Sequence, residues 1–515
     1  MSARRGLYFI AAVTWLAWGV PLLLQLGLSI RDARGLSFVG NYDTANYYLI
    51  AREFAVGHGL TDPVRWHHLG SSASVVRPAG DYWAPGWPAL LGVALRVFGT
   101  SQVAAIWFCA LLSLGLPLVV YAVTRSASND RAAGFAAALL VVLQERLRQT
   151  NVTPDMTLAA QLLTGLALLA VLHARCREWS PTTLLLAGAV AVAPVLVRTD
   201  LVWVAVVGAA WVALAEADTA AVRGRRLGMF LLGVIAVHGA YLACTVVGFG
   251  SLTPEPRRLA TWMTRYEDLY YLLSDPAFTT WRAQGLRQLL ELRLVALQKA
   301  LAGFRDQLPV GLFVVAAIGA VAWRRSNHGA ARALVAAALL ASVLTPILLV
   351  PVVASPDRMV LIASPLLCVL AGFVVPRLLV RRGWVLMAAV ILVTVVFGAC
   401  WPHPGAADRF RNWRAPFLQA PLWLDDLARV GMGSGAIILT NEPWHVALAT
   451  GRPTVMLPYD GPRAIERAIE LYHPTHVVIT AQPPLWAVAL SHVTPGLLSK
   501  LYQSPRMAAF AVQGR

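Results

Sequence analysis

The stretch TTLLLAGAVAVAPVLVRTDLVWVAVVGAAWVAL, residues 182–214, decides the fold class. One continuous helix of this length would be about 50 Å long, whereas the hydrocarbon core of a bilayer is about 30 Å thick. A charged side chain at the bilayer centre costs roughly 2.5 to 3.5 kcal/mol. Because the stretch carries Arg198 and Asp200 near its middle, it predicts two short membrane helices that turn back at residues 198–200.

The rest of the chain repeats this apolar pattern. The chain has 515 residues, of which 58% are hydrophobic and only 13% are charged, against about 25% charged in a typical soluble protein. Since a spanning helix needs about 20 mainly apolar residues, we expect an α-helical polytopic membrane protein with about eleven transmembrane helices. The first apolar segment, residues 6–29, is long for a signal peptide and lacks a small-x-small cleavage site, which favours a retained first helix.

The positive charges indicate the topology. The formal net charge is +17, but the arginines fall in small groups between apolar runs rather than on one stripe, which argues against nucleic-acid binding. Short basic loops are retained in the cytoplasm, so we expect a cytoplasmic N-terminus. The basic groups are Arg4 and Arg5, Arg125 and Arg131, Arg175 and Arg177, 223–226, 324–332 and 377–382. The expected outer segments are residues 30–101, 147–156, 249–308 and 353–357, with a turn at 198–200.

Two domains are expected. Residues 1–401 form the transmembrane module, with its last apolar run at Val385–Trp401. Residues 402–515 alternate short β-rich runs with helical stretches such as Pro462–Tyr472, which is typical of a small extracytoplasmic α/β domain. Within the fourth outer loop, leucines at helical spacing over Leu286–Phe304 predict a helix on the membrane surface.

Asp43 opens a short predicted helix just after the first span, in the text Gly40-Asn41-Tyr42-Asp43-Thr44. An Asp oxygen can accept the unpaired backbone N–H groups of a first helical turn, so capping alone explains the residue. The residues alone favour this capping role without excluding another.

Taken together, several motifs resemble the GT-C glycosyltransferases, the polyprenyl-phosphate-sugar-dependent transferases that include protein O-mannosyltransferases and the lipid A aminoarabinose transferases. The resemblance covers residues 5–400 and depends on the order and membrane side of the motifs. They are Asp43, the Pro-x-x-Pro segment Pro85–Pro88, Thr153-Pro154-Asp155, Arg198 and Arg358. The tail also resembles the small outer domain that many bacterial members carry.

The resemblance implies roles for these residues. Asp43 would be the catalytic base, and Asp155 a second carboxylate that positions donor or acceptor, although a helix N-cap also explains Asp155. Arg198 and Arg358 would bind the lipid phosphate, since a guanidinium offers forked donors to phosphate oxygens; both could instead reach toward lipid headgroups. The proline segment lacks the family's nearby lysine, and we expect Arg77 to take its place as a donor-phosphate ligand.

Thr44 follows Asp43, where many members carry a second acid. His67 and His68 could join Asp43 around a divalent metal, but adjacent histidines rarely converge on one ion, so no metal site is assigned.

The aromatic side chains of Tyr82, Trp83 and Trp87 are candidates for stacking on a sugar ring. Aromatic residues also collect at membrane interfaces without any ligand.

The main hypothesis is an inverting glycosyltransferase in the bacterial inner membrane. It would move a sugar from a polyprenyl-phosphate donor to a hydroxyl acceptor of a lipid, glycan or protein at the outer face. A transporter or flippase is the alternative, and a membrane scaffold with a partner-binding outer domain is a third. Transporters place charges near the bilayer midplane and often show inverted repeats. Here the charges gather at the outer ends of helices, which favours an enzyme that works at one face.

Overall fold

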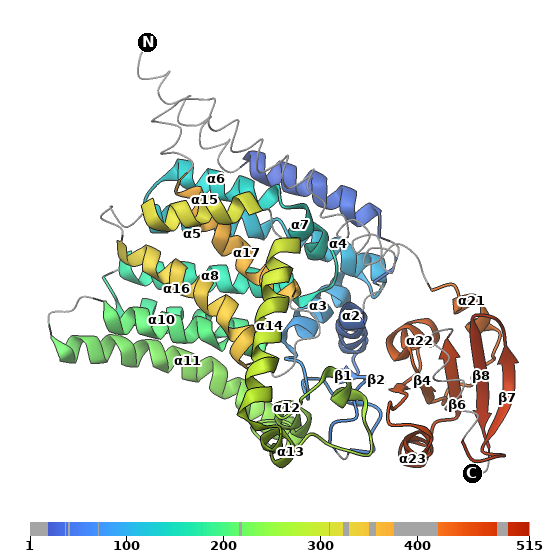
Figure 1. The fold of residues 1–515 in the computed structure, drawn as a ribbon. Helices are drawn as coiled ribbons and strands as arrows, with labels where there is room; N and C mark the ends of the chain where they lie inside the picture. Colours follow the sequence, from blue (N-terminus) through green and yellow to red (C-terminus); the bar gives the residue numbers. More distant parts are fainter. Residues whose placement is uncertain are drawn as a thin grey trace. The chain divides into compact units, whose positions relative to one another are not determined.

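The computed structural model describes residues 19–36, 38–39, 42–70, 72–176, 178–215, 219–307, 310–322, 329–349, 357–374, 421–480 and 493–513. They fall into two compact units (Figure 1). Unit 1 comprises residues 1–35, 106–244 and 293–411, and unit 2 comprises residues 36–105, 245–292 and 412–515. The second unit therefore unites the predicted first outer loop, part of the predicted fourth outer loop and the C-terminal segment. The predicted domain boundary at residues 401 and 402 stays a prediction.

Unit 1 is helical. Helix α17 packs against α5, α6, α8, α15 and α16, while α10 packs against α9 and α16 (Figure 1). Two helices, α4 and α14, cross from one unit to the other, and α11 ends in unit 2. The bounds are α4 Gln102–Leu112, α5 Gly115–Ser128, α6 Arg131–Val142, α7 Glu145–Asn151, α8 Met156–Cys176, α9 Pro181–Val192, α10 Val202–Leu214, α11 Ala220–Phe249, α14 Gly285–Gln307, α15 Val310–Ala322, α16 Gly329–Leu349 and α17 Asp357–Gly372.

The predicted turn at residues 198–200 is confirmed. Helix α9 ends at Val192, two short 3-10 segments follow at Ala193–Leu196 and Thr199–Leu201, and α10 begins at Val202. The charged residues Arg198 and Asp200 therefore lie between α9 and α10 and not inside one helix. The predicted surface helix at 286–304 is also helical, as part of α14; its place on the membrane stays a prediction.

Small residues let the helices of unit 1 approach closely. A Cβ at Gly188 in α9 would overlap the backbone carbonyl of Phe230 in α11, and one at Gly233 would overlap that of Leu185. Association of helices in lipid relies on such close backbone contact, because burial of apolar side chains gains little from an apolar solvent. These two glycines therefore set the distance between α9 and α11.

One charged residue of the predicted outer segment 147–156 lies inside unit 1. Arg148 in α7 is buried and places its Nε 2.7 Å from Oδ2 of Asp32, near the end of the helix formed by residues 19–34. An Nη1 of the same guanidinium donates to the carbonyl of Val142 at 3.0 Å. Arg148 departs from the positive-inside pattern, and this ion pair gives a structural reason for it.

Among the described residues, three helical stretches are long and apolar enough to cross a membrane by length and composition. They are Gln102–Ser128, Met156–Arg175 and Ala220–Phe249. Shorter apolar helices accompany them, including those on both sides of the 198–200 turn. Residues 6–18 and 385–401 of the predicted first and last spans lie outside the described residues, and the count of about eleven spans stays a prediction.

Unit 2 is built on a six-stranded sheet with the order β2-β5-β4-β6-β8-β7. The first four strands are parallel, and β8 and β7 are antiparallel to their neighbours. The bounds are β2 Val64–Arg65, β4 Ile438–Thr440, β5 Thr454–Met456, β6 His476–Thr480, β7 Leu498–Gln503 and β8 Met507–Val512. The sequence predicts β-rich runs at Ala436–Leu439, Thr454–Leu457 and His476–Ile479, and β4, β5 and β6 overlap these three runs.

Alternating side chains bury both faces of this sheet. Leu439 and Val477 pack with Ile465 of α23 (Pro462–Tyr472) on one face. Ile438 and Val478 pack on the other face with α22 (Pro443–Thr450) and α21 (Leu424–Ala428). Adjacent residues of one strand point to opposite faces, so this period of two in the sequence produces both halves of the core.

The edge strand β2 comes from the first outer loop. Val64 and Arg65 pair in parallel with Thr454 and Val455 of β5. The amide of Thr454 donates to the carbonyl of Pro63 at 3.1 Å. The remaining elements of unit 2 are α2 Tyr42–Ala55, β1 Thr61–Asp62, β3 Arg77–Pro78, α3 Gly86–Phe98, α12 Glu255–Ala260, a 3-10 helix η3 at Tyr266–Tyr270 and α13 Phe278–Ala283.

Candidate active site

Asp43 lies in the first turn of α2, as the sequence predicts. A carboxylate there is stabilised by the unpaired N–H groups and the positive end of the helix dipole. Residues 44–51 of the same helix are buried, which fixes α2 in the unit, while the Asp43 side chain is half-buried. Asp43, the candidate base, therefore lies at the N-terminal end of a well-packed helix.

The charge of Asp43 acts on two phenol groups. Burial, then the neighbouring Tyr266, and after these the charge of Asp43, raise the pKa of Tyr82 and of Tyr270 above the ordinary value. Tyr82 precedes α3, and Tyr270 ends η3.

An aromatic cluster contacts α2 at Tyr47, whose ring centroid lies 5.5 Å from that of Trp83. Trp66 and Trp83 stack with ring centroids 4.4 Å apart and an interplanar angle of 17°, and Tyr82 meets Trp66 edge-on at 4.9 Å. These side chains line a small pocket together with carboxylates and an amide. Its lining includes Asn46, Tyr47, Asp62, Trp66, Asp81, Tyr82 and Trp83.

Trp87, the third predicted stacking residue, lies in α3 and is 0% exposed. Its faces are covered by protein. Tyr82 and Trp83, by contrast, are half-buried and retain exposed surface. The structure thus separates the three aromatic candidates, and a ligand could reach Tyr82 and Trp83 without rearrangement.

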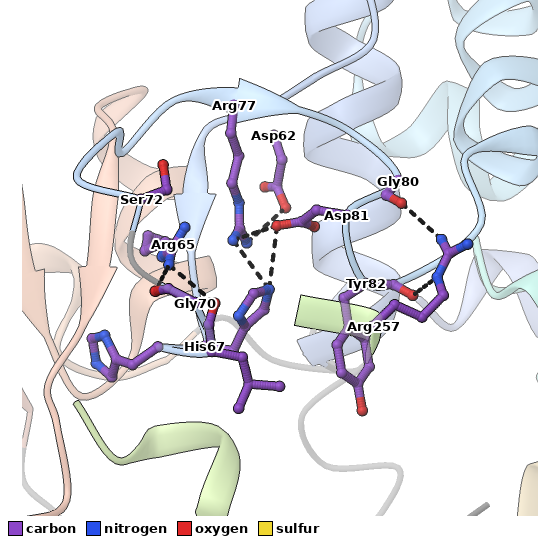
Figure 2. Close-up of polar contacts among 12 residues, drawn as sticks. Asp62, Arg65, His67, Gly70, Ser72, Arg77, Gly80, Asp81, Tyr82 and Arg257 are labelled. Carbon is purple, nitrogen blue, oxygen red and sulfur yellow. Dashed lines mark hydrogen bonds and ion pairs between the residues drawn. The ribbon is translucent and has the colours of Figure 1, made fainter. Parts of the chain in front are cut away.

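Arg77 lies in a buried charged cluster (Figure 2). Asp62 and Arg77 are directly opposed in the antiparallel pair β1–β3, with 3.6 Å between Arg77 Nη2 and Asp62 Oδ2. Asp81 lies four residues after Arg77, and its Oδ2 is 2.6 Å from Arg77 Nη1. Gly80, with φ at +106°, provides the left-handed backbone that turns the chain before Asp81. Cross-strand pairing and this turn bring both carboxylates to one guanidinium.

The cluster perturbs three of its titratable groups. Burial raises the pKa of Asp62 to about 6, although the charge of Arg77 acts in the opposite direction. Burial acts to raise the pKa of Asp81 as well, but Arg77 and His67 hold it well below its usual range. Burial, and then the charge of Arg77, lowers the pKa of His67 to about 3. At neutral pH His67 is therefore uncharged beside the Arg77–Asp81 ion pair.

The two adjacent histidines have different partners. The Nε2 of His67 lies 3.0 Å from Arg77 Nη1 and 3.4 Å from Asp81 Oδ2. The Nε2 of His68 donates to the carbonyl of Met456 in β5 at 2.9 Å. Within the described residues, no group of three His, Cys, Asp or Glu side chains is arranged to hold a metal ion.

The other predicted site residues belong to unit 1. Asp155 is buried, and its Oδ1 accepts the backbone N–H of Thr157 at 2.8 Å and the Thr157 hydroxyl at 2.5 Å, so it caps α8. Arg198 forms a bidentate pair with Asp200 through Nε and Nη2, each at 2.9 Å. Arg358 falls in the first turn of α17, and its side chain lies outside the described part of the structure.

The structure also reveals residues near Asp43 that the sequence did not indicate. Tyr42 donates its hydroxyl to Oε1 of Glu442 at 3.0 Å, and Oε2 of Glu442 lies 2.9 Å from Nδ1 of His445. The Nε1 of Trp444 donates to Oδ1 of Asn46 at 3.1 Å. Through these contacts the C-terminal segment packs directly on the helix that carries Asp43.

No protein-family profile matches the chain, and neither does the sequence of any curated protein. Solved structures do match. The oligosaccharyltransferase of Archaeoglobus fulgidus is 12% identical with a TM-score of 0.61, covering 90% of this chain and 69% of that one. ArnT from Cupriavidus metallidurans, bound to undecaprenyl phosphate, is 12% identical with a TM-score of 0.55, covering 99% and 98%. The mycobacterial arabinofuranosyltransferase AftD is 14% identical with a TM-score of 0.55, covering 98% and 42%.

The protein has the fold of the GT-C membrane glycosyltransferases, and the similarity extends across the whole chain. It is an integral membrane protein by that fold and by its long apolar helices. The mixed C-terminal sheet follows the mostly helical multi-span part, as in ArnT. The resemblance that the sequence motifs indicated is thereby confirmed at the level of fold.

Proposed function

We propose that this protein is an inverting glycosyltransferase that transfers a sugar from a polyprenyl-phosphate donor to a hydroxyl acceptor at the outer face of the membrane. One observation carries the proposal: the fold match spans nearly the entire chain and nearly all of ArnT, which was solved with undecaprenyl phosphate. AglB, the Archaeoglobus fulgidus oligosaccharyltransferase, was solved with a dolichol-phosphate and an inhibitory peptide.

Asp43 is the proposed base. Its carboxylate takes the proton of the acceptor hydroxyl while the hydroxyl oxygen attacks the anomeric carbon from the face opposite the lipid phosphate. The bond from that carbon to the phosphate oxygen breaks, and the phosphate leaves with the electron pair. One displacement inverts the anomeric configuration. The half-buried position of Asp43 in the first turn of α2 supports this role, because the side chain is held on a buried helix and is still accessible.

Arg198 and Arg358 are the proposed ligands of the donor phosphate. Phosphate is a good leaving group once its developing charge is neutralised, which paired N–H donors do well. The carboxylate of Asp200 orients the Arg198 guanidinium. Arg77 already faces two buried carboxylates, so we assign it to the stability of the first outer loop instead of to the phosphate.

Asp155 is proposed as the second carboxylate in addition to its observed role as a cap of α8. Tyr82 and Trp83 are proposed to stack on a sugar ring, because both keep exposed surface. Stacking by Trp87 remains a prediction from the sequence. The proposed orientation has the N-terminus in the cytoplasm and unit 2 outside a bacterial plasma membrane.

Two measurements on the purified full-length protein test the proposal. Lipid extracted with the protein and identified by mass spectrometry should contain a polyprenyl phosphate or its glycoside. In nanodiscs, a panel of undecaprenyl-phosphate sugars labelled in the sugar should include one donor that is consumed, with inversion of the anomeric configuration in the product by NMR. Movement of intact labelled lipid between leaflets without sugar release would instead indicate the flippase alternative.

A further inference from the structure

We propose that the acceptor is a neutral, hydroxyl-rich molecule, that is a carbohydrate, and that it binds against a group of tyrosine hydroxyls beside Asp43. This inference rests on the proposed function, because Asp43 is the group that meets the acceptor hydroxyl. The tyrosine group consists of Tyr42, Tyr266, Tyr270 and Tyr459.

Three segments that are distant in sequence contribute these tyrosines. Tyr42 begins α2, Tyr266 and Tyr270 are the two ends of η3, and Tyr459 follows β5. The rings of Tyr266 and Tyr270 meet edge-on at 5.8 Å, and those of Tyr270 and Tyr459 lie 4.7 Å apart at 32°. The amide of Tyr459 donates to the carbonyl of Tyr270 at 2.9 Å, which fixes the two segments together.

The tyrosine group remains accessible. Tyr42 is 47% exposed and Tyr459 is 43% exposed, although the phenol of Tyr42 is held by Glu442 at 3.0 Å. A phenol hydroxyl both donates and accepts hydrogen bonds, and its ring offers an apolar face. Sugar rings present the complementary pattern, hydroxyls along their edges and C–H groups on their faces.

Carboxylates act on three of these phenols. After burial, Glu442 raises the pKa of Tyr42, and Glu442 and Glu267 contribute to the raised pKa of Tyr459. The pKa of Tyr270 is raised by burial, then by Tyr266 and Tyr459, and last by Asp43. Tyr42, Tyr270 and Tyr459 therefore stay protonated, and the hydroxyl of Tyr42 lies against the carboxylate of Glu442.

Two arginines of the segment that carries Tyr266 and Tyr270 are directed to protein groups. Arg265 pairs with Asp268 at 3.0 Å and lies over the ring of Tyr271. Arg257 donates to the carbonyls of Gly80 and Tyr82 at 2.7 and 3.3 Å (Figure 2). An acceptor that carried a phosphate would meet repulsion here, whereas neutral hydroxyls would be well bonded. The field thus selects against anionic acceptors.

The test uses the full-length protein in nanodiscs with two matched acceptor probes, octyl mannopyranoside and octyl mannopyranoside 6-phosphate. Transfer from the labelled donor is measured as kcat/KM for each probe, and donor hydrolysis to water is measured without acceptor. Binding of each probe is followed separately by saturation-transfer NMR with no donor present. The neutral probe should be preferred by at least about tenfold. Tyr459→Phe should raise KM for the neutral probe while kcat changes little.

Two variants sharpen the test. Glu442→Gln removes one charge next to Tyr42 and should narrow the preference by improving use of the phosphorylated probe. Glu470→Gln, on the exposed side of α23 where Glu470 pairs with Arg467, is the matched control and should leave the preference unchanged.

The outcomes separate the two proposals. Suppose that the protein consumes donor but uses and binds the phosphorylated probe as well as the neutral probe, or better. This result overturns the inference about the acceptor, while the proposed glycosyltransferase function stands. Binding of the neutral probe without any donor consumption overturns the proposed function and leaves the binding surface. If no donor is consumed and neither probe binds, both the acceptor inference and the proposed function are overturned.

Discussion

Nη1 of Arg77 lies 2.6 Å from Oδ2 of Asp81, and both side chains are almost completely buried in the first outer loop. Removal of one partner from a buried ion pair leaves a charge without compensation and typically costs about 3 to 5 kcal/mol. Arg77→Met should therefore lower the free energy of unfolding of unit 2 strongly, as followed by the loss of tryptophan fluorescence in denaturant. Arg258→Met is the control, because the Arg258–Glu255 pair is exposed and should contribute at most about 1 kcal/mol. If the two variants lowered the free energy of unfolding equally, the structural role assigned to Arg77 would be wrong.

The proposed base gives the second prediction. Asp43→Asn preserves the size of the side chain in α2 but removes the carboxylate, so kcat for sugar transfer should fall by about 100-fold or more. The affinity for the lipid donor should remain within about threefold, because the phosphate ligands are elsewhere. Glu53→Gln alters another acid of the same helix and should leave transfer unchanged. Full transfer activity in Asp43→Asn would reject the assignment.

A third prediction distinguishes the two roles of Asp155. A serine can cap a helix almost as well as an aspartate, so Asp155→Ser should keep the thermal stability of the protein. If the carboxylate also positions substrate, the same variant should lose at least about tenfold in kcat/KM. Asp155→Ala should lose about 1 kcal/mol of stability in addition. A serine variant with full activity would show that Asp155 is only a cap.

The fourth prediction concerns pH. The pKa of Asp62 is about 6 in the folded protein against 3.8 for the free side chain. Between these values the unfolded chain has lost a proton that the folded protein still binds, so this group reduces stability as pH rises from about 4 to about 6. Asp62→Asn removes that dependence.

The Asp62→Asn variant should equal the wild type near pH 4 and exceed its stability above about pH 6. The size of the difference should be on the order of 2 to 3 kcal/mol, less the loss of the contact with Arg77. Melting temperatures of both proteins from about pH 4 to about pH 8 provide the measurement. A difference that stays flat with pH would contradict the raised pKa of Asp62.

The sequence predicted those parts of the fold that depend on local signals. Charges at Arg198 and Asp200 located a turn because the bilayer penalises them, and the apolar spacing of Pro462–Tyr472 located α23 with the same bounds. Asp43 was placed correctly at the start of a helix. Each of these signals lies within a few helical turns of the chain.

Long-range contacts could not be predicted in this way. Strand β2 has only two residues and no alternation of its own, and its partner lies in the C-terminal segment. Tyr42 and Glu442 are 400 residues apart, and nothing in the sequence joins them. For the buried cluster around Arg77, the sequence offers one weak signal, the four-residue spacing of Arg77 and Asp81. This spacing is common for ion pairs on helices, but in a loop it does not predict a contact.

The ladder between β2 and β5 has a consequence for how the chain threads the membrane. Two strands that share backbone hydrogen bonds must occupy the same compartment, so residues 64–65 and 454–455 are on one side. Whatever number of crossings connects them, that number is even. A single amide–carbonyl contact, from Thr454 to Pro63, thus fixes the parity of the whole path. Insertion or deletion of one membrane span between these strands would put β2 and β5 on opposite sides of the membrane. The sheet would then lose its edge strand β2.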